Sequence, residues 1–242
     1  MFSADGRRVY SSATKSGGGT VLLERTGPRM KELTDKHHKI LSMAFSADAK
    51  AFAYVAQSAE GAPPELFFKE KSFGKTHEGS VILAVDAGGK QVAYVAKSGK
   101  GVTVVIGTEK PSPKAYDYVR ELAFSPDGTK LAFVANVGGN PDIDTPGLVV
   151  GGQDLVVIRP VAGEGPWTDS ALCSEARDLV WIAEGKVGYA ARSEEGWQIV
   201  CGDKQSPGYD AVGRAVLESD GRTLAFGARK GRELWWQHLS LD

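Results

Sequence analysis

The 242-residue sequence contains only two cysteines, Cys173 and Cys201. Two thiols are too few for a disulfide scaffold, and their spacing does not fit a four-ligand zinc site. No apolar run approaches the roughly 18 residues of a membrane-spanning helix, and residues 1–5 lack the basic and apolar regions of a signal peptide. We therefore expect a soluble chain, cytoplasmic, or periplasmic if an upstream signal has been removed.

An excess of charge of either sign is also missing. The chain has 29 lysine and arginine residues against 30 aspartate and glutamate residues, a formal net charge of -1. Such a balance creates no overall field that would attract nucleic acid or an anionic membrane surface. We therefore expect neither a nucleic-acid partner nor membrane insertion, and the charge balance does not name a partner.

Catalytic motifs are absent as well. The chain has no Gly-x-Ser-x-Gly sequence, which would place a hydrolase nucleophile. Its glycine run at 17–19 lacks the Lys-Ser/Thr pair of a phosphate-binding loop, and neither cysteine lies in a catalytic pattern. Asp142 and Asp144 are too few for an EF-hand loop, and no histidine pair has metal-site spacing. We expect a non-enzyme without metal or cofactor, although catalytic carboxylates on separate repeats would leave no local motif.

What the sequence does contain is a repeated hairpin, clearest at residues 121–135. Two apolar runs, Leu122–Phe124 and Leu131–Val134, flank a Ser-Pro-Asp-Gly sequence. Proline presets the first central φ of a type I turn, and glycine suits the exit of the turn. Both faces of the second strand are apolar, so both must be covered. A sheet packed between similar sheets meets that requirement.

The first apolar residue after the turn is a marker that recurs along the chain. The six markers are Val9, Phe52, Val92, Leu131, Val187 and Leu224, at intervals of 43, 40, 39, 56 and 37 residues. A period of about 40 residues is typical of four-stranded propeller blades. The longest interval contains residues 138–147, rich in Gly, Pro and Asp, which we expect to form a long exposed loop.

These repeats predict an all-β fold, a six-bladed β-propeller with four-stranded antiparallel blades, in a single domain spanning residues 1–242. The repeats fall at about 1–35, 36–75, 76–115, 116–170, 171–208 and 209–242. The first repeat lacks an inner strand and the last lacks a clear fourth strand, so the terminal join is incomplete and would expose strand edges. Either the natural protein continues beyond Met1, which we prefer, or the termini close the ring irregularly.

Several turn sequences resemble the WD40-like PD40 propeller repeats of bacterial TolB-type proteins. The resemblance is carried by Phe45-Ser46-Ala47-Asp48, by residues 124–133 and by Leu217-Glu218-Ser219-Asp220-Gly221, and extends over nearly all of the chain. It implies a propeller of six or more blades that binds protein or is an accessory to a peptidase. The third and fifth repeats depart from the motif, with Gly88-Gly89 and Glu184-Gly185 in place of Asp-Gly.

One pair of positions in each repeat after the first, fifteen and fourteen residues before the marker, carries the candidate partner-binding residues. They are His37, His38, His77, Glu78, Tyr116, Asp117, Tyr209 and Asp210, with Leu172 and Cys173 at the same positions of the fifth repeat. In a propeller these positions begin the inner strands, so the residues would surround one mouth of the central channel. The alternative is that each Tyr packs between blades and each Asp bonds backbone amides of a turn.

Two further groups of residues bear on binding. The loops between the second and third strands form a mildly basic rim: Lys15, Lys97, Lys100, Arg192, Arg229, Lys230 and Arg232. Such residues either solvate exposed turns or bind an anion or acidic protein. Trp197, Trp235 and Trp236 fall on third strands, where we expect burial between blades. Because adjacent strand residues face opposite ways, we expect at most one of the last two to be free for a partner.

The leading hypothesis is a non-catalytic binding scaffold that recognises a protein or peptide partner through the channel mouth and loop rim. The alternative is the accessory propeller of a hydrolase or carbohydrate-active enzyme. A third interpretation is a stable ring whose function depends on a missing N-terminal region.

Overall fold

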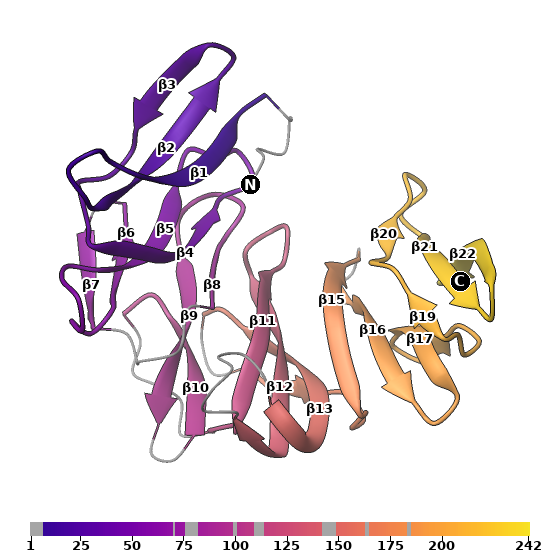
Figure 1. Cartoon of the computed structure of the whole chain (residues 1–242). Coiled ribbons are helices and arrows are strands. Elements are labelled where there is room, and N and C mark those ends of the chain that lie inside the picture. Colours follow the sequence, from indigo (N-terminus) through magenta and orange to yellow (C-terminus); the bar gives the residue numbers. More distant parts are fainter. Residues whose placement is uncertain are drawn as a thin grey trace. The chain divides into compact units, whose positions relative to one another are not determined.

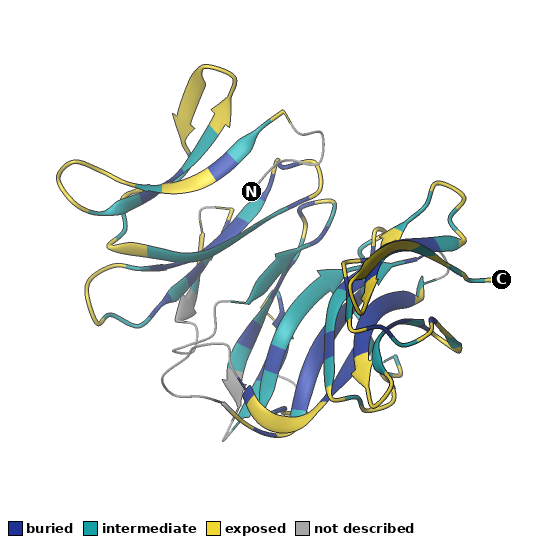
Figure 2. Ribbon diagram, turned by 45° about the vertical axis from the view of Figure 1, so that its right-hand side comes forward, coloured by how far each residue is buried: buried dark blue, intermediate teal, exposed yellow. Residues whose placement is uncertain are grey.

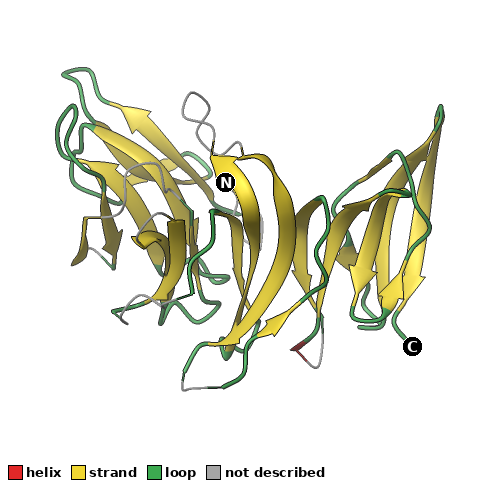
Figure 3. Ribbon diagram, turned by 90° about the horizontal axis from the view of Figure 1, so that it is seen from below, coloured by secondary structure: helices red, strands yellow, loops and turns green. Residues whose placement is uncertain are grey.

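The computed structural model describes residues 7–69, 71–75, 82–98, 101–108, 114–141, 149–162, 165–182 and 185–242. Within these ranges the chain forms antiparallel β-strands joined by turns and loops (Figure 3). No α-helix occurs in them, and the one helical residue described, Gly185, is in a 3₁₀ turn. It divides into two compact units, Met1–Ala115 and Tyr116–Asp242. The predicted all-β class is therefore confirmed.

The described residues of the first unit form three sheets, each made of strands that follow one another in the chain (Figure 1). The first sheet has β1 (Val9–Thr14), β2 (Thr20–Thr26) and β3 (Arg29–Glu32); the second has β4 (Lys39–Phe45), β5 (Phe52–Gln57), β6 (Glu65–Phe68) and β7 (Lys71–Lys75); the third has β8 (Leu83–Val85), β9 (Val92–Ser98) and β10 (Gly101–Ile106). The markers Val9, Phe52 and Val92 each begin a strand, as the repeat period predicts.

The second unit also contains three sheets in its described residues. The fourth sheet has β11 (Tyr118–Phe124), β12 (Lys130–Pro141), β13 (Val149–Pro160) and β14 (Thr168–Asp169); the fifth has β15 (Glu175–Trp181), β16 (Val187–Ser193), β17 (Gly196–Cys201) and β18 (Lys204–Gln205); the sixth has β19 (Ala211–Val212), β20 (Val216–Leu217), β21 (Thr223–Lys230) and β22 (Glu233–Ser240). In the sixth sheet, β19 and β20 both pair with one edge of β21, and β22 pairs with the other.

Local hydrogen bonds explain the recurring turn. Ser125 Oγ donates to Asp127 Oδ1 at 2.6 Å and accepts from Lys130 N–H at 2.9 Å, while Gly128 N–H donates to Ser125 O at 2.9 Å. Gly128 has a φ of 71°, the left-handed conformation for which glycine has no steric penalty. The second sheet repeats this turn with Ser46 and Asp48. The Ser-Pro-Asp-Gly sequence thus encodes its hairpin within six residues.

The core lies between neighbouring sheets. All of Leu131–Ala135 in β12 is fully buried (Figure 2), so both faces of this strand are covered as predicted. Ala132 and Val134 pack with Val187 and Tyr189 of the fifth sheet. The opposite face of the fifth sheet packs on the sixth through Ile199, Leu224 and Phe226, among others. Burial of each large apolar side chain contributes about 1.5–3 kcal/mol, so stacking of the sheets stabilises the unit.

The insertion in the fourth repeat differs from the prediction. Residues 138–141, expected to lie in a loop, belong to a long hairpin in which β12 continues to Pro141 and pairs with the start of β13. The ladder skips Gly138 and Gly152, whose φ values are 77° and 73°. Glycine at these positions permits a paired bulge, so pairing persists through a composition that normally indicates a loop. The remainder of the expected loop, residues 142–148, lies outside the described residues.

Candidate partner-binding site

The two predicted aspartates hold hairpins of the second unit. Asp117 Oδ2 accepts a hydrogen bond from Gly138 N–H at 2.6 Å, and Asp117 N–H donates to Asn136 O at 3.0 Å. Asp210 repeats both bonds, with Gly231 N–H at 2.6 Å and Arg229 O at 2.9 Å. Each carboxylate therefore satisfies a backbone donor, as the structural alternative expects. Contact of either aspartate with a partner stays a prediction.

The two predicted tyrosines are buried. Tyr116 and Tyr209 are 4% and 9% exposed, respectively. The Tyr116 ring meets Phe133 edge-on at 5.6 Å between ring centroids, and Tyr209 meets Phe226 in the same way at 6.1 Å. These rings contribute packing to the core, which limits what either could offer to a partner.

The predicted histidines belong to the first unit. His37 is half-buried, and its Nε2 lies 3.2 Å from Tyr54 Oη. Burial lowers the pKa of His37, although the nearby carboxylates of Asp35 and Glu65 act in the opposite direction. His38 is exposed and donates its backbone N–H to Gln57 O at 2.9 Å. The remaining candidates, His77 and Glu78, lie outside the described residues, so the proposed channel mouth stays a prediction.

The alignment of the fifth repeat was wrong by one residue. In the second and sixth repeats, His37 and Tyr209 each form an isolated β-bridge to a residue of the preceding sheet. In the fifth repeat Cys173, not Leu172, forms this bridge, with Asp154. The next residue, Ser174, donates its N–H to Arg192 O at 3.1 Å, as Asp117 does to its own partner. The cause is a hairpin one residue shorter, because Trp181 pairs with Val187 whereas the fourth sheet spaces its equivalent pair by seven residues.

Among the described residues, the sixth sheet carries the most exposed large apolar side chain and two exposed tryptophans beside it. Leu234, Trp235 and Trp236 on β22 are 82%, 48% and 65% exposed. The prediction that at most one of the two tryptophans is free is therefore wrong. Trp235 does face the side that packs on the fifth sheet, since it pairs with Ala228, but it lies outside the apolar cluster that the two sheets share.

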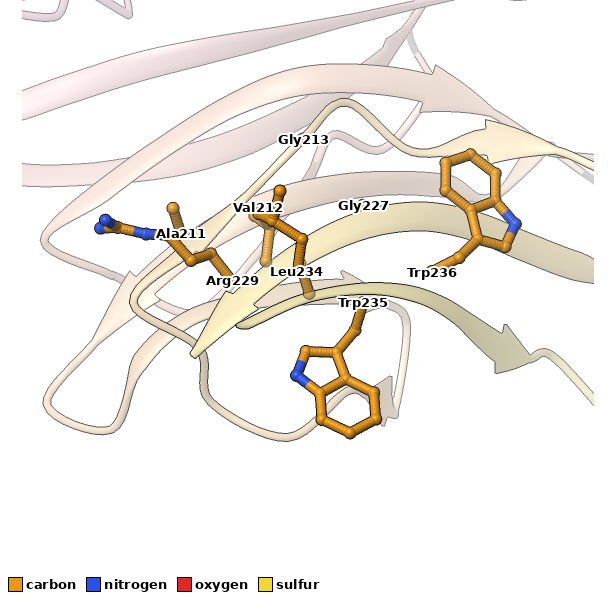
Figure 4. Close-up of a pocket in the computed structure, with 9 residues that line it drawn as sticks. Ala211, Val212, Gly213, Gly227, Arg229, Leu234, Trp235 and Trp236 are labelled. Carbon is orange, nitrogen blue, oxygen red and sulfur yellow. The ribbon is translucent and has the colours of Figure 1, made fainter. Parts of the chain in front are cut away.

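These residues border an open, mainly apolar groove of about 580 Å³ (Figure 4). Leu234 and Trp236 stand opposite Arg229 and Gly227 of β21, on one face of the sheet. Gly227 leaves the floor hollow, because a Cβ added there would meet nothing within 4 Å. Figure 4 shows the Trp236 ring on one side of the groove and the Arg229 side chain toward the other. The groove therefore combines an aromatic wall with one guanidinium.

The groove adjoins an open sheet edge. Within the contiguous segment 185–242, β22 pairs with β21 alone. Leu241 N–H donates to Arg222 O at 2.9 Å, which fixes the hydrogen-bonded pairs of this ladder. Because hydrogen-bonded and non-hydrogen-bonded pairs alternate in an antiparallel ladder, Leu234, Trp236 and His238 direct their backbone N–H and C=O groups away from β21. Within residues 185–242, these residues thus offer both apolar side chains and backbone groups that no strand pairs with.

The predicted basic rim is only partly available. Lys15 pairs with Glu32 at 2.8 Å, and Lys230 Nζ donates to Gly208 O at 3.2 Å. Arg229 lines the groove. Lys100 and the side chain of Lys97 lie outside the described residues. The sequence signal that locates the groove is the Leu-Trp-Trp run at 234–236 in the last repeat, together with the absence of a predicted fourth strand after it.

No protein-family model matches the sequence, and no curated protein matches it. Solved structures are similar to it. TolB from Acinetobacter baumannii matches with a TM-score of 0.50 at 15% identity, over 98% of this chain and 62% of TolB. A puromycin-hydrolysing peptidase of Mycobacterium tuberculosis matches with a TM-score of 0.58 at 15% identity, over 99% of this chain and 48% of the peptidase. The β-propeller domain of the Trilobed protease from Pyrococcus furiosus matches with a TM-score of 0.57 at 12% identity, over 98% of this chain and 78% of the protease domain. That domain is described as having an open velcro topology.

These likenesses establish the fold. The chain is a β-propeller similar to that of TolB and to propellers of peptidases, and it spans less than two thirds of the length of the first two proteins. The number of blades stays a prediction. No helix of membrane-spanning length and apolarity occurs in the described part of the chain. A propeller fold does not by itself identify a function, so any function must be argued from the surface of this chain.

Proposed function

We propose that this chain is a non-catalytic, PD40-type propeller that binds a protein partner by adding an extended segment of that partner to the free edge of β22. The observation that carries the proposal is the coincidence of three exposed apolar side chains, a groove and outward backbone groups on one strand. An added strand gains affinity from main-chain hydrogen bonds and specificity from alternate side chains.

The other sheets indicate what kind of occupant fits this edge. In the second, fourth and fifth sheets, the third strand is paired on its outer side by a fourth strand, namely β7, β14 and β18. The outer side of β22 offers the same ladder geometry without such a strand in residues 185–242. An extended peptide is therefore the occupant whose backbone matches, and apolar residues at alternate positions would cover Leu234 and Trp236.

The test selects ligands and then blocks the site. A phage-displayed library of random linear peptides is panned on the immobilised chain, and selected peptides are measured by fluorescence anisotropy. We expect peptides with alternating apolar residues. Gly227→Val should fill the groove and weaken binding by about tenfold or more. Trp236→Ala should weaken binding by a similar factor, because it removes the aromatic side chain beside the groove. Neither change should lower stability much, since Gly227 faces open space and Trp236 is mostly exposed.

Val150→Ala is the matched control, because Val150 is an exposed apolar residue elsewhere in the same unit. The proposal fails if no peptide is selected, or if the groove variants bind selected peptides as well as the Val150 variant does. A second copy of the chain is the other possible occupant. Sedimentation velocity would reveal it as a dimer that Gly227→Val dissociates, and that result would also overturn the proposal.

The predicted mouth can be tested with the same peptides. Charge reversal at Asp117 and Asp210 that leaves all binding intact counts against a role for the mouth. Because both carboxylates accept backbone hydrogen bonds, Asp→Asn variants are the better comparison, since the amide oxygen preserves that bond. Binding that is lost on reversal but retained by the amide would instead indicate loss of the hairpin.

The second candidate is an accessory propeller of a hydrolase, and the neighbours favour it specifically, since a peptidase and the propeller domain of a protease are among them. In that case the 242-residue chain would be a piece of a longer product that carries its own catalytic residues. The test is the mass of the natural product on an immunoblot. A product of about 25.7 kDa, the mass of this chain, would exclude this candidate.

A further inference from the structure

A second cavity lies between the first and second sheets. Its volume is about 300 Å³, and its lining includes Glu32, Asp35, His37, Tyr54 and Phe67. That volume is at the lower end for small-molecule sites, so it suits one side chain or a small functional group. The cavity lies entirely within the first unit, and nothing in the groove on the sixth sheet contributes to it.

Three rings form one side of this cavity. The Tyr54 and Phe67 rings stack at 4.9 Å with an interplanar angle of 8°. The His37 ring meets both, at 5.4 Å from Tyr54 and 5.1 Å from Phe67 between centroids. Burial lowers the pKa of His37, which favours the uncharged imidazole at neutral pH. The rings are held rigidly, because Tyr54 is buried and His37 Nε2 lies within hydrogen-bond distance of its hydroxyl.

Carboxylates form the rim. Glu32 is already paired with Lys15 at 2.8 Å. Asp35 is exposed and makes no hydrogen bond or ion pair with any described residue, yet it lies close enough to His37 to act on it electrostatically. The cavity thus has an aromatic wall beside one uncompensated carboxylate. Aromatic faces attract cations, and a carboxylate at the rim supplies a partner for hydrogen-bonding N–H groups.

We propose that this cavity binds a guanidinium group, the side chain of an arginine in a peptide, between the His37–Phe67 rings and the Asp35 carboxylate. Guanidinium fits better than an ammonium, because it is planar, stacks on aromatic faces and presents parallel N–H donors to a carboxylate. The site is independent of the β22 groove, so it stands or falls separately from the function proposed above.

The probe is N-acetyl-arginine amide, with N-acetyl-citrulline amide as its uncharged analogue of the same shape. Binding is followed through the imidazole signals in ¹H–¹³C spectra, and His238, in the sixth sheet, provides an internal reference. Titration to about 10 mM detects millimolar affinity. We expect saturable shifts of His37 with the arginine probe, none with citrulline, and little change at His238. An Arg-containing tripeptide that binds more tightly than the free amide identifies a peptide as the source, whereas equal affinity would overturn that part of the proposal.

Variants identify the contacts. Asp35→Asn should weaken binding by about tenfold, and Phe67→Leu by a similar factor. Glu60→Gln is the matched control, because Glu60 is an exposed carboxylate of the same unit that does not line the cavity. Asp35 makes no bond in the described part of the chain, so its substitution should leave the melting temperature unchanged. Equal binding of citrulline, equal binding by Asp35→Asn, or absence of any His37 shift would each overturn the proposal.

Discussion

Replacement of Glu121 tests how neighbouring sheets of the second unit are held together. Glu121 lies on β11, and its Oε1 accepts a hydrogen bond at 3.2 Å from Leu179 N–H on β15. A register shift between Arg177 and Val180 releases this N–H from the ladder of its own sheet. Leu179 is 2% exposed, so its N–H depends on the Glu121 carboxylate rather than on solvent in the folded chain. The Glu121 side chain is therefore the acceptor that completes a bulge in the next sheet.

The expected loss of unfolding free energy depends on whether the variant still offers Leu179 N–H an acceptor. Glu121→Ala removes the acceptor, and an unsatisfied buried N–H costs about 1–3 kcal/mol. Glu121→Gln keeps an acceptor oxygen at the same place but removes the charge. With a urea slope of about 2 kcal/mol/M, a loss of about 2 kcal/mol lowers the unfolding midpoint by about 1 M for the alanine variant. We expect the glutamine variant to match or exceed the unmodified chain at neutral pH.

The pH dependence provides a second criterion. Burial raises the pKa of Glu121, with backbone N–H donors and the Arg214 charge acting against it. Because the folded pKa exceeds the unfolded one, stability from this group is complete below the unfolded pKa and is lost as pH rises through the folded pKa. The glutamine variant has no such loss. Its advantage over the unmodified chain should grow between about pH 4 and pH 7.

Urea unfolding followed by tryptophan fluorescence is the suitable assay, because all five tryptophans lie in residues 116–242 and report on this unit alone. Trp181 also lies at the same contact, where its Nε1 donates to Ala123 O at 3.0 Å. The reasoning is refuted if Glu121→Gln loses as much stability as Glu121→Ala at neutral pH. A difference between the glutamine variant and the unmodified chain that stays constant with pH would refute the proposed cost of burying the charge.

Three further predictions use the turns. Ser125→Ala should cost about 1–3 kcal/mol in urea unfolding, because it leaves the Lys130 N–H without its acceptor. Hydrogen bonds, chiefly from Ser125, hold the pKa of Asp127 at about 2. Its contribution to stability is therefore present above the unfolded pKa near 4 and is lost as pH falls toward 2. Asp127→Asn should reduce the loss of stability between about pH 4 and pH 2, measured by urea unfolding. Gly152→Ala should destabilise the chain by about 2 kcal/mol more than Gly151→Ala in thermal melts. Both glycines have a positive φ, but only at Gly152 would an added Cβ clash with the facing strand, where it would lie 2.4 Å from Gly139 N.

The sequence predicts those parts of the fold that depend on neighbours in the chain. The turn at Ser125 is set by bonds that span at most five residues, so its motif can be read directly. The burial of both faces of β12 likewise follows from its continuous apolar run, because successive residues of a strand face opposite sides of the sheet. In the third repeat, where the motif departs, Asp86 Oδ1 accepts both Lys90 and Gln91 N–H at 2.6 Å and restores an equivalent turn.

The features that the sequence does not predict depend on partners far along the chain. The bulge in β15 is completed by Glu121, 58 residues away from Leu179, and the sequence of β15 alone gives no indication of it. The cavity at His37 needs rings from three separate segments, whose distances depend on how two sheets pack. Exposure of Trp235 depends on where the fifth sheet stops covering the sixth. None of these is a property of local composition.

The location of the proposed partner site follows from how the second unit uses its polar groups. Glu121 and Trp181 join the fourth and fifth sheets, and Arg177 joins the fifth and sixth by donating to Val212 O at 2.9 Å. Polar side chains near the first strands are thus occupied with neighbouring sheets. Of the seven large apolar residues most exposed in the described chain, four belong to the sixth sheet: Val216, Leu234, Trp235 and Trp236. Exposed apolar surface and, within residues 185–242, a strand edge without a pairing strand therefore occur together at β22. Burial there offers a partner more free energy than any contact with the aspartates that hold the hairpins.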